Sequence, residues 1–422
     1  MSEKNNKYTP NLSFPEFTGE WEEKTLGEVC DSILTGFPFK GEDITDDASG
    51  HPILRAFSIG EGIIRHGKDY DKYYPYDAEK LKKYEVRKGD IVISMDGSVG
   101  KNIALISEKE ERNLLIQRVA RLRITDYPIH LIFQQIISQR FKDYAAGEKK
   151  GAVIAHISQK QIELFPIYIP NSPAEQQKIA SCLSTMDDLI AAQAEKVEVL
   201  KEKKTGLMQQ LFPQSGETTP RLRFPEFTGE WEVKKLGEVA KKVNRKNTLL
   251  KVSRVLTNSA NLGVVDQGAY FDRDIAVKEN TGNYSIVEIE DFVYNPRIST
   301  AAPVGPISIN KVGQGIMSPL YTIFKFHTGS ILFYEQYFQT TIWHSYLKGI
   351  ANFGARFDRM NITTEGFFNM PLYVPTDPAE QEKIASCLSS LDDQIAAETE
   401  KLTALKDYKK GLMQQLFPQP AK

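Results

Sequence analysis

Residues 173–214 read PAEQQKIASCLSTMDDLIAAQAEKVEVLKEKKTGLMQQLFPQ, and residues 378–419 repeat this stretch as PAEQEKIASCLSSLDDQIAAETEKLTALKDYKKGLMQQLFPQ. The two copies align without an insertion, and most positions are identical or conservatively exchanged. A shorter pair, FPEFTGEW, begins at Phe14 and again at Phe224. Solenoid and propeller repeats recur every ~20 to 50 residues. The much longer spacing here indicates tandem duplication of a whole module.

Both long copies have the apolar spacing of a helix that packs along a narrow seam. Successive apolar positions lie three, four or seven residues apart, which is a heptad pattern. Pro173 and Pro378 stand in the expected first turn, followed by Glu175 and Glu380, as helix N-termini prefer. The predicted seam residues are Ile179, Leu183, Met186, Ile190, Val197, Leu200, Leu207 and Leu211 in the first copy, and Ile384, Leu388, Leu391, Ile395, Leu402, Leu405, Leu412 and Leu416 in the second.

One amphipathic helix of this length cannot bury its seam alone. Two helices with matching seams can bury each other, and duplication places a pseudo-two-fold axis between the modules. We therefore expect an antiparallel pair, each helix about 57 Å long at ~1.5 Å per residue, with a globular domain at each end. The alternative is that each helix packs only on its own domain.

The two blocks between the repeats hardly resemble each other, yet they follow the same order of elements. Each has short apolar strands separated by turn signals, one internal helix, and a closing strand, PIYIP at 166–170 or PLYVP at 371–375. The predicted fold class is two globular α/β (α+β) domains joined by two long helices that form an antiparallel coiled coil. The predicted bounds are a tail at 1–11, the first domain at 12–172, the first helix at 173–213, a linker at 214–221, the second domain at 222–377, the second helix at 378–418 and a tail at 419–422.

Composition places few limits on function. The 422 residues include 53 basic and 55 acidic side chains, giving a net charge of −2, so nucleic-acid binding would need a local basic face. The three cysteines are too few and too scattered for a disulfide framework or a zinc site. The polar start MSEKNNKYTP and the lack of an apolar stretch of ~18 residues favour a cytoplasmic protein.

Polar and basic residues gather on glycine-rich turns at corresponding places in the two blocks. Arg, Asn, Gln and Ser on protruding loops are side chains that read base edges, and Lys nearby suits phosphate. For any single residue, a solvated loop position is the alternative. The candidate DNA-binding residues are Lys88, Ser94, Asp96, Ser98, Lys101, Gln117, Arg118, Lys149, Lys150 and His156 in the first block, and Asn295, Arg297, Ser299, Thr300, Ser318, Asn352, Arg356 and Arg359 in the second.

The sequence contains near matches to catalytic motifs but no complete one. The turn Asp96–Asn102 resembles a phosphate loop, but that motif needs glycine where Met95 stands and Ser or Thr where Asn102 stands. The tetrapeptide at 295–298, NPRI, lacks the second proline and the aromatic residue of the amino-methyltransferase loop. The six histidines show no metal-ligand spacing. We therefore predict no catalytic residue and no metal site in this chain.

The repeated framework resembles the specificity subunit of type I restriction–modification systems. The resemblance rests on the closing strands, the PAEQ-type helix starts, the twin LMQQLFP at 207–213 and 412–418, and the pair WEEKTLGEV at 21–29 and WEVKKLGEV at 231–239. These motifs occur twice, in order, over nearly the whole chain.

The resemblance implies that each block is a target recognition domain for one half of a bipartite, asymmetric DNA site. It also implies that the helices space these domains and that two methyltransferase subunits dock on the chain. Those partners would methylate adenine N6 with S-adenosylmethionine, and restriction subunits would add ATP- and Mg-dependent translocation and cleavage. No cofactor is implied for this chain. The alternative of a different class is an adaptor or antirestriction scaffold that binds the methyltransferase without reading DNA.

Overall fold

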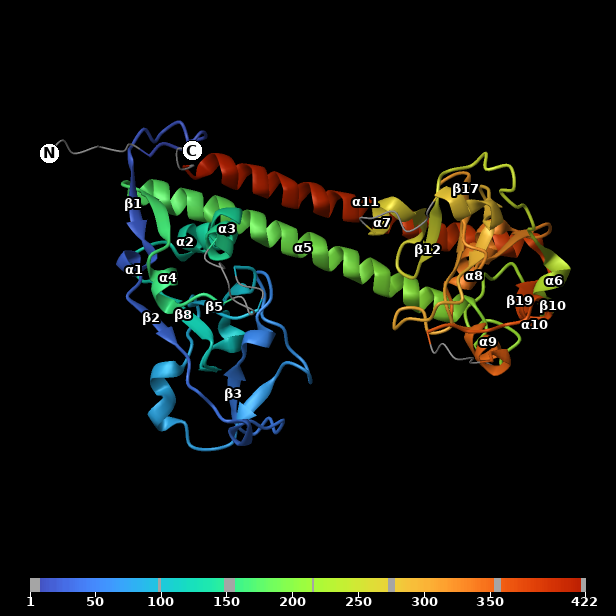
Figure 1. Cartoon of the computed structure of the whole chain (residues 1–422). Coiled ribbons are helices and arrows are strands. Elements are labelled where there is room, and N and C mark those ends of the chain that lie inside the picture. Colours follow the sequence, from blue (N-terminus) through green and yellow to red (C-terminus); the bar gives the residue numbers. More distant parts are fainter. Residues whose placement is uncertain are drawn as a thin grey trace. The chain divides into compact units, whose positions relative to one another are not determined.

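The computed structural model describes residues 8–97, 100–147, 156–214, 216–271, 278–352 and 358–418 (Figure 1). The chain forms two compact units, residues 1–194 with 400–422 and residues 195–399. Each long helix, α5 (Pro173–Leu211) or α11 (Pro378–Leu416), therefore contributes one part to each unit.

The globular part of the first unit is built around a four-stranded antiparallel sheet in the order β2-β8-β5-β6. A three-stranded sheet, β4-β3-β7, and a ribbon of β1 with β9 complete its strands. The elements are β1 (Trp21–Thr25), α1 (Leu26–Val29), β2 (Ser32–Thr35), β3 (His51–Leu54), β4 (Lys72–Tyr74), β5 (Ile91–Ser94), β6 (Ile103–Leu105), β7 (Leu114–Leu115), β8 (Val119–Arg123), α2 (Ile129–Ile136), α3 (Gln139–Gly147), α4 (Gln159–Glu163) and β9 (Pro166–Pro170).

The second unit has a central sheet of matching order, β11-β18-β15-β16. Its ribbon pairs β10 with β19, and two further strand pairs, β12 with β13 and β14 with β17, flank the sheet. The elements are β10 (Trp231–Lys235), α6 (Leu236–Val239), β11 (Ala240–Lys242), β12 (Leu256–Ser259), β13 (Gly263–Asp266), α7 (Gln267–Phe271), β14 (Ser285–Val287), β15 (Phe292–Tyr294), β16 (Ile307–Ile309), β17 (Gly315–Met317), β18 (Thr322–Phe326), α8 (Ile331–Phe338), α9 (His344–Ile350), α10 (Thr364–Phe368) and β19 (Pro371–Pro375).

Central strand β5 is buried on both faces of its sheet. Successive side chains of a strand point to opposite faces. Accordingly Ile91 and Ile93 join the apolar cluster that includes the helix residue Ile132, whereas Val92 joins a second cluster on the other face. Its counterpart β15 does the same with Phe292 and Val293. A run of consecutive apolar residues thus becomes a doubly covered strand.

Within each unit the start of one long helix packs beside the end of the other. In the first unit Ile179 and Leu183 share a buried cluster with Leu416. In the second unit Ile384 shares one with Leu211. The two helices are therefore antiparallel, and the predicted fold class is confirmed. The alternative of helices packing only on their own domains is wrong.

The sixteen predicted seam residues are all buried or half-buried. Where successive seam residues lie seven apart, the structure places polar side chains on the seam between them. Gln193, Lys204 and Lys409 are each at least nine-tenths buried at positions where the apolar spacing skips one. Nothing in the structure tests the predicted domain bounds as such, and they stay a prediction.

Candidate nucleic-acid interface

The same two segments meet in both globular domains. The turn that leaves β5 is bridged to the segment ahead of α4 through Asp96 and His156. The turn that leaves β15 is bridged to the segment ahead of α10 through Arg297 and Arg359. Two blocks with little common sequence thus place candidate DNA-binding residues at one equivalent site.

In the first unit this site holds a cation, a carboxylate and an imidazole. The Nδ1 atom of His156 lies 2.6 Å from Oδ1 of Asp96, and Nε of Arg118 lies 3.7 Å from Oδ2 of the same carboxylate. Arg118 has a φ of 73°, in the left-handed region that non-glycine residues rarely adopt. Its side chain is 56% exposed. The carboxylate can orient one edge of the guanidinium while other N–H groups face outward.

In the second unit two arginines share one carboxylate. Asp358 Oδ2 lies 3.5 Å from Nη2 of Arg297 and 3.9 Å from Nε of Arg359. Ser299 and Thr300 are exposed on the same turn. Arg297 is 60% exposed. The arrangement can present a guanidinium, which pairs well with guanine O6 and N7, beside hydroxyl groups that accept or donate.

Other candidate residues of the second unit are engaged within the chain. Asn295 donates from Nδ2 to the carbonyl of Asn258 at 2.9 Å and accepts from the amide of Arg297 at 3.0 Å. Asn352 is exposed and bridged to Asn361. Ser318 is half-buried, and its hydroxyl accepts from the Leu320 amide at 3.4 Å.

The remaining candidates of the first unit are scattered. Ser94 is buried and its hydroxyl donates to the carbonyl of Asp96 at 3.1 Å, whereas Gln117 and Lys101 are exposed. The ammonium of Lys88 pairs with the carboxylate of Glu108. The candidates Ser98, Lys149, Lys150 and Arg356 lie outside the described residues.

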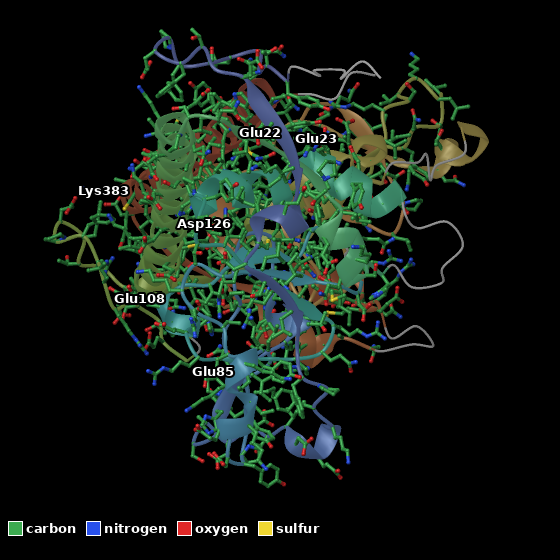
Figure 2. All side chains as sticks on the ribbon, turned by 90° about the vertical axis from the view of Figure 1, so that its left-hand side faces the viewer. Glu22, Glu23, Glu85, Glu108, Asp126 and Lys383 are labelled. Atoms are coloured by element: carbon green, nitrogen blue, oxygen red, sulfur yellow. The ribbon has the colours of Figure 1, made fainter. Side chains whose placement is uncertain are left out.

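Glu108, the partner of Lys88, is one of several carboxylates on the first unit. Figure 2 shows Glu22 and Glu23 on strand β1, with Glu108 and Glu85 lower on the same unit. Glu22, Glu23 and Glu108 are exposed. Glu22 pairs with Lys24 and Glu108 with Lys88, so lysines offset these carboxylates. The equivalent turns that leave β5 at Asp96, where Arg118 joins, and β15 at Arg297 are the candidates for contact with nucleic acid.

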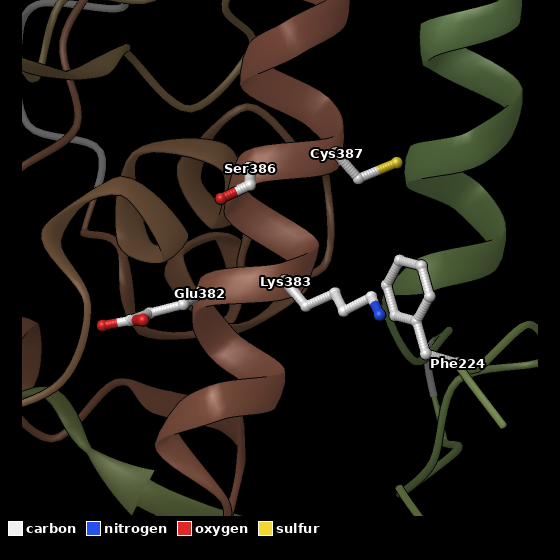
Figure 3. A pocket seen from close by; sticks show the side chains of 5 residues that line it. All are labelled: Phe224, Glu382, Lys383, Ser386 and Cys387. Atoms are coloured by element: carbon white, nitrogen blue, oxygen red, sulfur yellow. The ribbon is translucent and has the colours of Figure 1, made fainter. Parts of the chain in front are cut away.

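A second repeated surface lies on the long helices. In the second unit the ammonium of Lys383 lies 5.2 Å from the ring centre of Phe224 and pairs with Glu226. Figure 3 shows Lys383 and Cys387 pointing from α11 toward Phe224 and α5, while Glu382 and Ser386 point away. We call this surface, lined by Phe224, Glu382, Lys383, Ser386 and Cys387, the second frame groove.

The first unit carries the equivalent of that groove. Lys178 lies 4.8 Å from the ring centre of Phe14 and pairs with Glu16. Phe14, Lys178, Ser181 and Cys182 line a hollow with residues of the end of α11. We call it the first frame groove. Because both grooves derive from the duplicated sequence, they share a phenylalanine, a lysine, a serine and a cysteine, whereas Gln177 stands where the second groove has Glu382.

Two absences apply only to the ranges that the structure describes. There, no three His, Cys, Asp or Glu side chains come together as metal ligands. Over the same ranges, no helix combines the length and the apolar character needed to cross a bilayer.

Comparison with known proteins identifies the family. The model of the type I restriction modification DNA specificity domain matches residues 18–202 and again 228–407. The putative type I restriction enzyme MjaX specificity subunit of Methanocaldococcus jannaschii is 27% identical, over 98% of this chain and 96% of its own length. The MjaVIII specificity subunit of the same organism is 27% identical over 56% of this chain and 52% of its own length.

Solved structures support the fold. The S subunit of a type I restriction–modification system from M. genitalium has a TM-score of 0.60 at 13% identity, covering 98% of this chain and 100% of that one. A chain from a study of complex assembly and conformational transition of the type I R-M system has a TM-score of 0.52 at 15% identity, over 97% and 100%.

The chain is a sequence-recognition protein built on a duplicated frame. It belongs to the family of type I restriction–modification specificity subunits, as the resemblance in the repeats predicted. The adaptor alternative is not favoured, because both family matches cover the domains described as DNA specificity domains.

The structure adds residues that the sequence did not single out. Asp358 is the shared partner of the two arginines, but an isolated aspartate in a loop carries no signal in the sequence. Ile63 and Leu262 are aliphatic side chains more than half exposed on tight turns. The sequence could have indicated that both lie on turns, because each stands beside glycine between strand-like runs.

Proposed function

We propose that each globular domain reads one half of a bipartite, asymmetric DNA site. The observation that carries this is the equivalent site, which brings together Asp96, Arg118 and His156 in one domain and Arg297 with Arg359 in the other. One architecture with unlike side chains at the same place suits two unlike half-sites rather than a palindrome.

The proposal assigns two methyltransferase subunits to this chain, one for each frame groove. Phe14 with Lys178 and Phe224 with Lys383 repeat the same aromatic–cation pair, which supports two docking events of the same kind. Restriction subunits join through that complex. The long helices set the gap between the half-sites.

The chemistry belongs to the partners in this proposal. S-adenosylmethionine, ATP and Mg are bound by the methyltransferase and restriction subunits, and this chain supplies recognition without catalysis. An adenine within a duplex must leave the stack before its N6 can be methylated, so the methyltransferase supplies the base-flipping pocket. The complex acts on DNA in the cytoplasm.

Omission of this chain tests the proposal. The methyltransferase encoded beside its gene is expressed in a methylation-free host, with and without this chain, and N6-methyladenine is measured in total DNA. We expect methylation only when both are present, with a complex of one specificity chain and two methyltransferase subunits by native mass spectrometry. Methylation that persists at the same level without this chain contradicts the proposal.

A further inference from the structure

Each globular domain exposes an aliphatic side chain on the turn that lies beside the last strand of its central sheet. Leu262 lies in the loop of the β12–β13 hairpin, directly before Gly263, which pairs with Ser259. Its side chain is 65% exposed. Ile63 stands in the turn closed by the bridge between Ile59 and Ile64, and is 58% exposed. We call these two turns the tip turns.

Backbone hydrogen bonds fix the first tip turn against the edge of the central sheet. The amide of Gly60 donates to the carbonyl of Ile63 at 2.8 Å. Ile103 of β6 accepts from the Gly62 amide at 2.8 Å and donates to the Gly60 carbonyl at 3.1 Å. The aliphatic side chain is thus held at a fixed position, beside the strand that follows the turn at Asp96.

The second tip turn is fixed by a buried hydroxyl. Oγ of Ser259 accepts from the amides of Asn261 and Leu262, both at 3.3 Å. Gly263 has a φ of 66°, and a Cβ there would lie 3.5 Å from Cβ of Ser308 on β16. This turn therefore lies against β16, the strand equivalent to β6.

The second tip turn also adjoins the candidate DNA-binding turn. Asn295 donates to the carbonyl of Asn258, the residue ahead of Ser259, at 2.9 Å. One surface hollow is lined by residues of both turns, among them Leu262, Gly263, Ala302 and Pro306. A ligand that contacts Arg297 and its turn would therefore come close to Leu262.

A single exposed leucine on a surface is ordinary. Here an exposed aliphatic side chain recurs on the turn beside the last strand of the central sheet in two domains whose sequences have otherwise diverged. Ile63 follows Gly62, and Leu262 precedes Gly263, the glycine of each turn that has a positive φ. Neither isoleucine nor leucine can read the donor and acceptor pattern of a base edge. Apolar side chains that protrude into DNA act instead as wedges, which unstack a base step and kink the duplex.

We propose that Ile63 and Leu262 are apolar wedges, each pressed between neighbouring base pairs of the half-site that its domain reads. The opened step lowers the cost of moving the target adenine out of the stack. The inference rests on the proposed function, because it requires each domain to bind one half-site. It adds two specificity residues that act through the shape of DNA.

The test uses the complete complex with its methyltransferase subunits. The DNA carries 2-aminopurine, a fluorescent base that brightens when unstacked, at one position at a time across both half-sites. We expect one bright step per half-site besides the target adenine. Leu262→Ala should abolish it in one half, and slow methylation of that half by about tenfold, while Leu262→Met should keep both.

Matched controls separate the wedge from general loss of apolar surface. Leu332 of α8 is 46% exposed, and Leu164, which ends α4, is 51% exposed. Leu332→Ala and Leu164→Ala should leave fluorescence and methylation unchanged. Ile63→Ala should repeat the effect of Leu262→Ala in the other half-site.

The outcomes distinguish the two proposals. If the unmodified complex methylates both halves, and Leu262→Ala and Ile63→Ala keep the bright steps and the rates, the wedge inference is overturned and the proposed function stands. If the unmodified complex shows no bipartite methylation, the proposed function itself fails.

Discussion

The ammonium group of Lys204 on α5 donates to the carboxylate of Asp392 on α11 at 2.6 Å. The same carboxylate accepts from the amide of Gln336 on α8 at 2.9 Å. The network occurs again in the first unit. There Lys409 pairs with Asp187, and Gln134 of α2 donates to that carboxylate at 2.5 Å. In each unit, one aspartate therefore ties both long helices to the globular domain.

Removal of Asp392 should destabilise the second unit because it leaves the ammonium of Lys204 buried, with only 8% of that side chain exposed. We expect Asp392→Ala to lower the free energy of unfolding by about 2 kcal/mol. Hydrogen exchange of amides at 385–395 measures the change locally. The control is Lys196→Ala. Lys196 is 54% exposed in its pair with Glu398, and such pairs contribute less than about 1 kcal/mol. Equal effects of the two substitutions would contradict a special role for the buried network.

One buried carboxylate of the duplicated frame has different partners in the two copies. In the second unit Arg223 donates from Nε and Nη2 to the two carboxylate oxygens of Glu380, at 2.6 and 2.7 Å, and the indole of Trp231 donates to the same group at 3.3 Å. In the first unit Ser13 replaces the arginine. Glu175 is 2% exposed, and its Oε2 has no hydrogen-bond partner among the described residues.

Glu175, which lacks the arginine partner of Glu380, should make the first unit more stable in mild acid. Burial raises the pKa of its carboxyl above the ordinary value of 4.5. The folded state therefore holds a proton that the unfolded chain has released, and stability falls as the pH rises from 4.5 through the raised pKa. Glu175→Gln should remove this fall and stabilise the first unit by about 1 kcal/mol at pH 8. Hydrogen exchange of amides at 175–185, compared at pH 5 and pH 8, measures it.

The opposite result is expected for the paired copy. The Arg223 side chain is only 18% exposed, and Glu380→Gln removes its charged partner. This should lower the free energy of unfolding by about 3 kcal/mol. The same exchange experiment on amides at 380–390 measures it. If both substitutions change stability in the same direction, the difference between the two copies has no energetic consequence.

Ser13→Arg should transfer the ion pair to the first unit. The side chain would start from the position equivalent to Arg223, so it can reach the buried carboxylate of Glu175. We expect slower exchange of amides at 175–185 at pH 8. Combination with Glu175→Gln supplies the control, because the added arginine should then give little gain.

Recognition by the two domains should be separable by single substitutions. Arg118→Ala should reduce the free energy of discrimination between bases at one half-site by about 1 to 3 kcal/mol. Arg297→Ala should do so at the other half-site. Sequencing of methylated sites reads both effects. Arg221→Ala is the control, since Arg221 is 66% exposed in a pair with Glu217. Equal loss at both halves would assign the arginines to phosphate contact or folding.

The frame was predictable because helix and repeat signals are local in sequence. The heptad of Ile179 and Leu183 needs only spacing to be recognised. Lys204 interrupts that spacing, and its partner Asp392 comes from the other copy. The network could therefore be recognised only in the folded structure. Likewise Arg118 and His156 were candidates by residue type, but Asp96 brings them together only through tertiary pairing. Ser94 illustrates the limit, because its residue type gave no sign of its burial.

Single-molecule sequencing of DNA from a methylation-free host tests the central claim most directly. The host expresses this chain with the methyltransferase encoded beside its gene. The account predicts N6-methyladenine on opposite strands of one bipartite motif with two unlike halves and a fixed unread gap. A palindromic or uninterrupted motif, or no motif despite a purified complex, would contradict it.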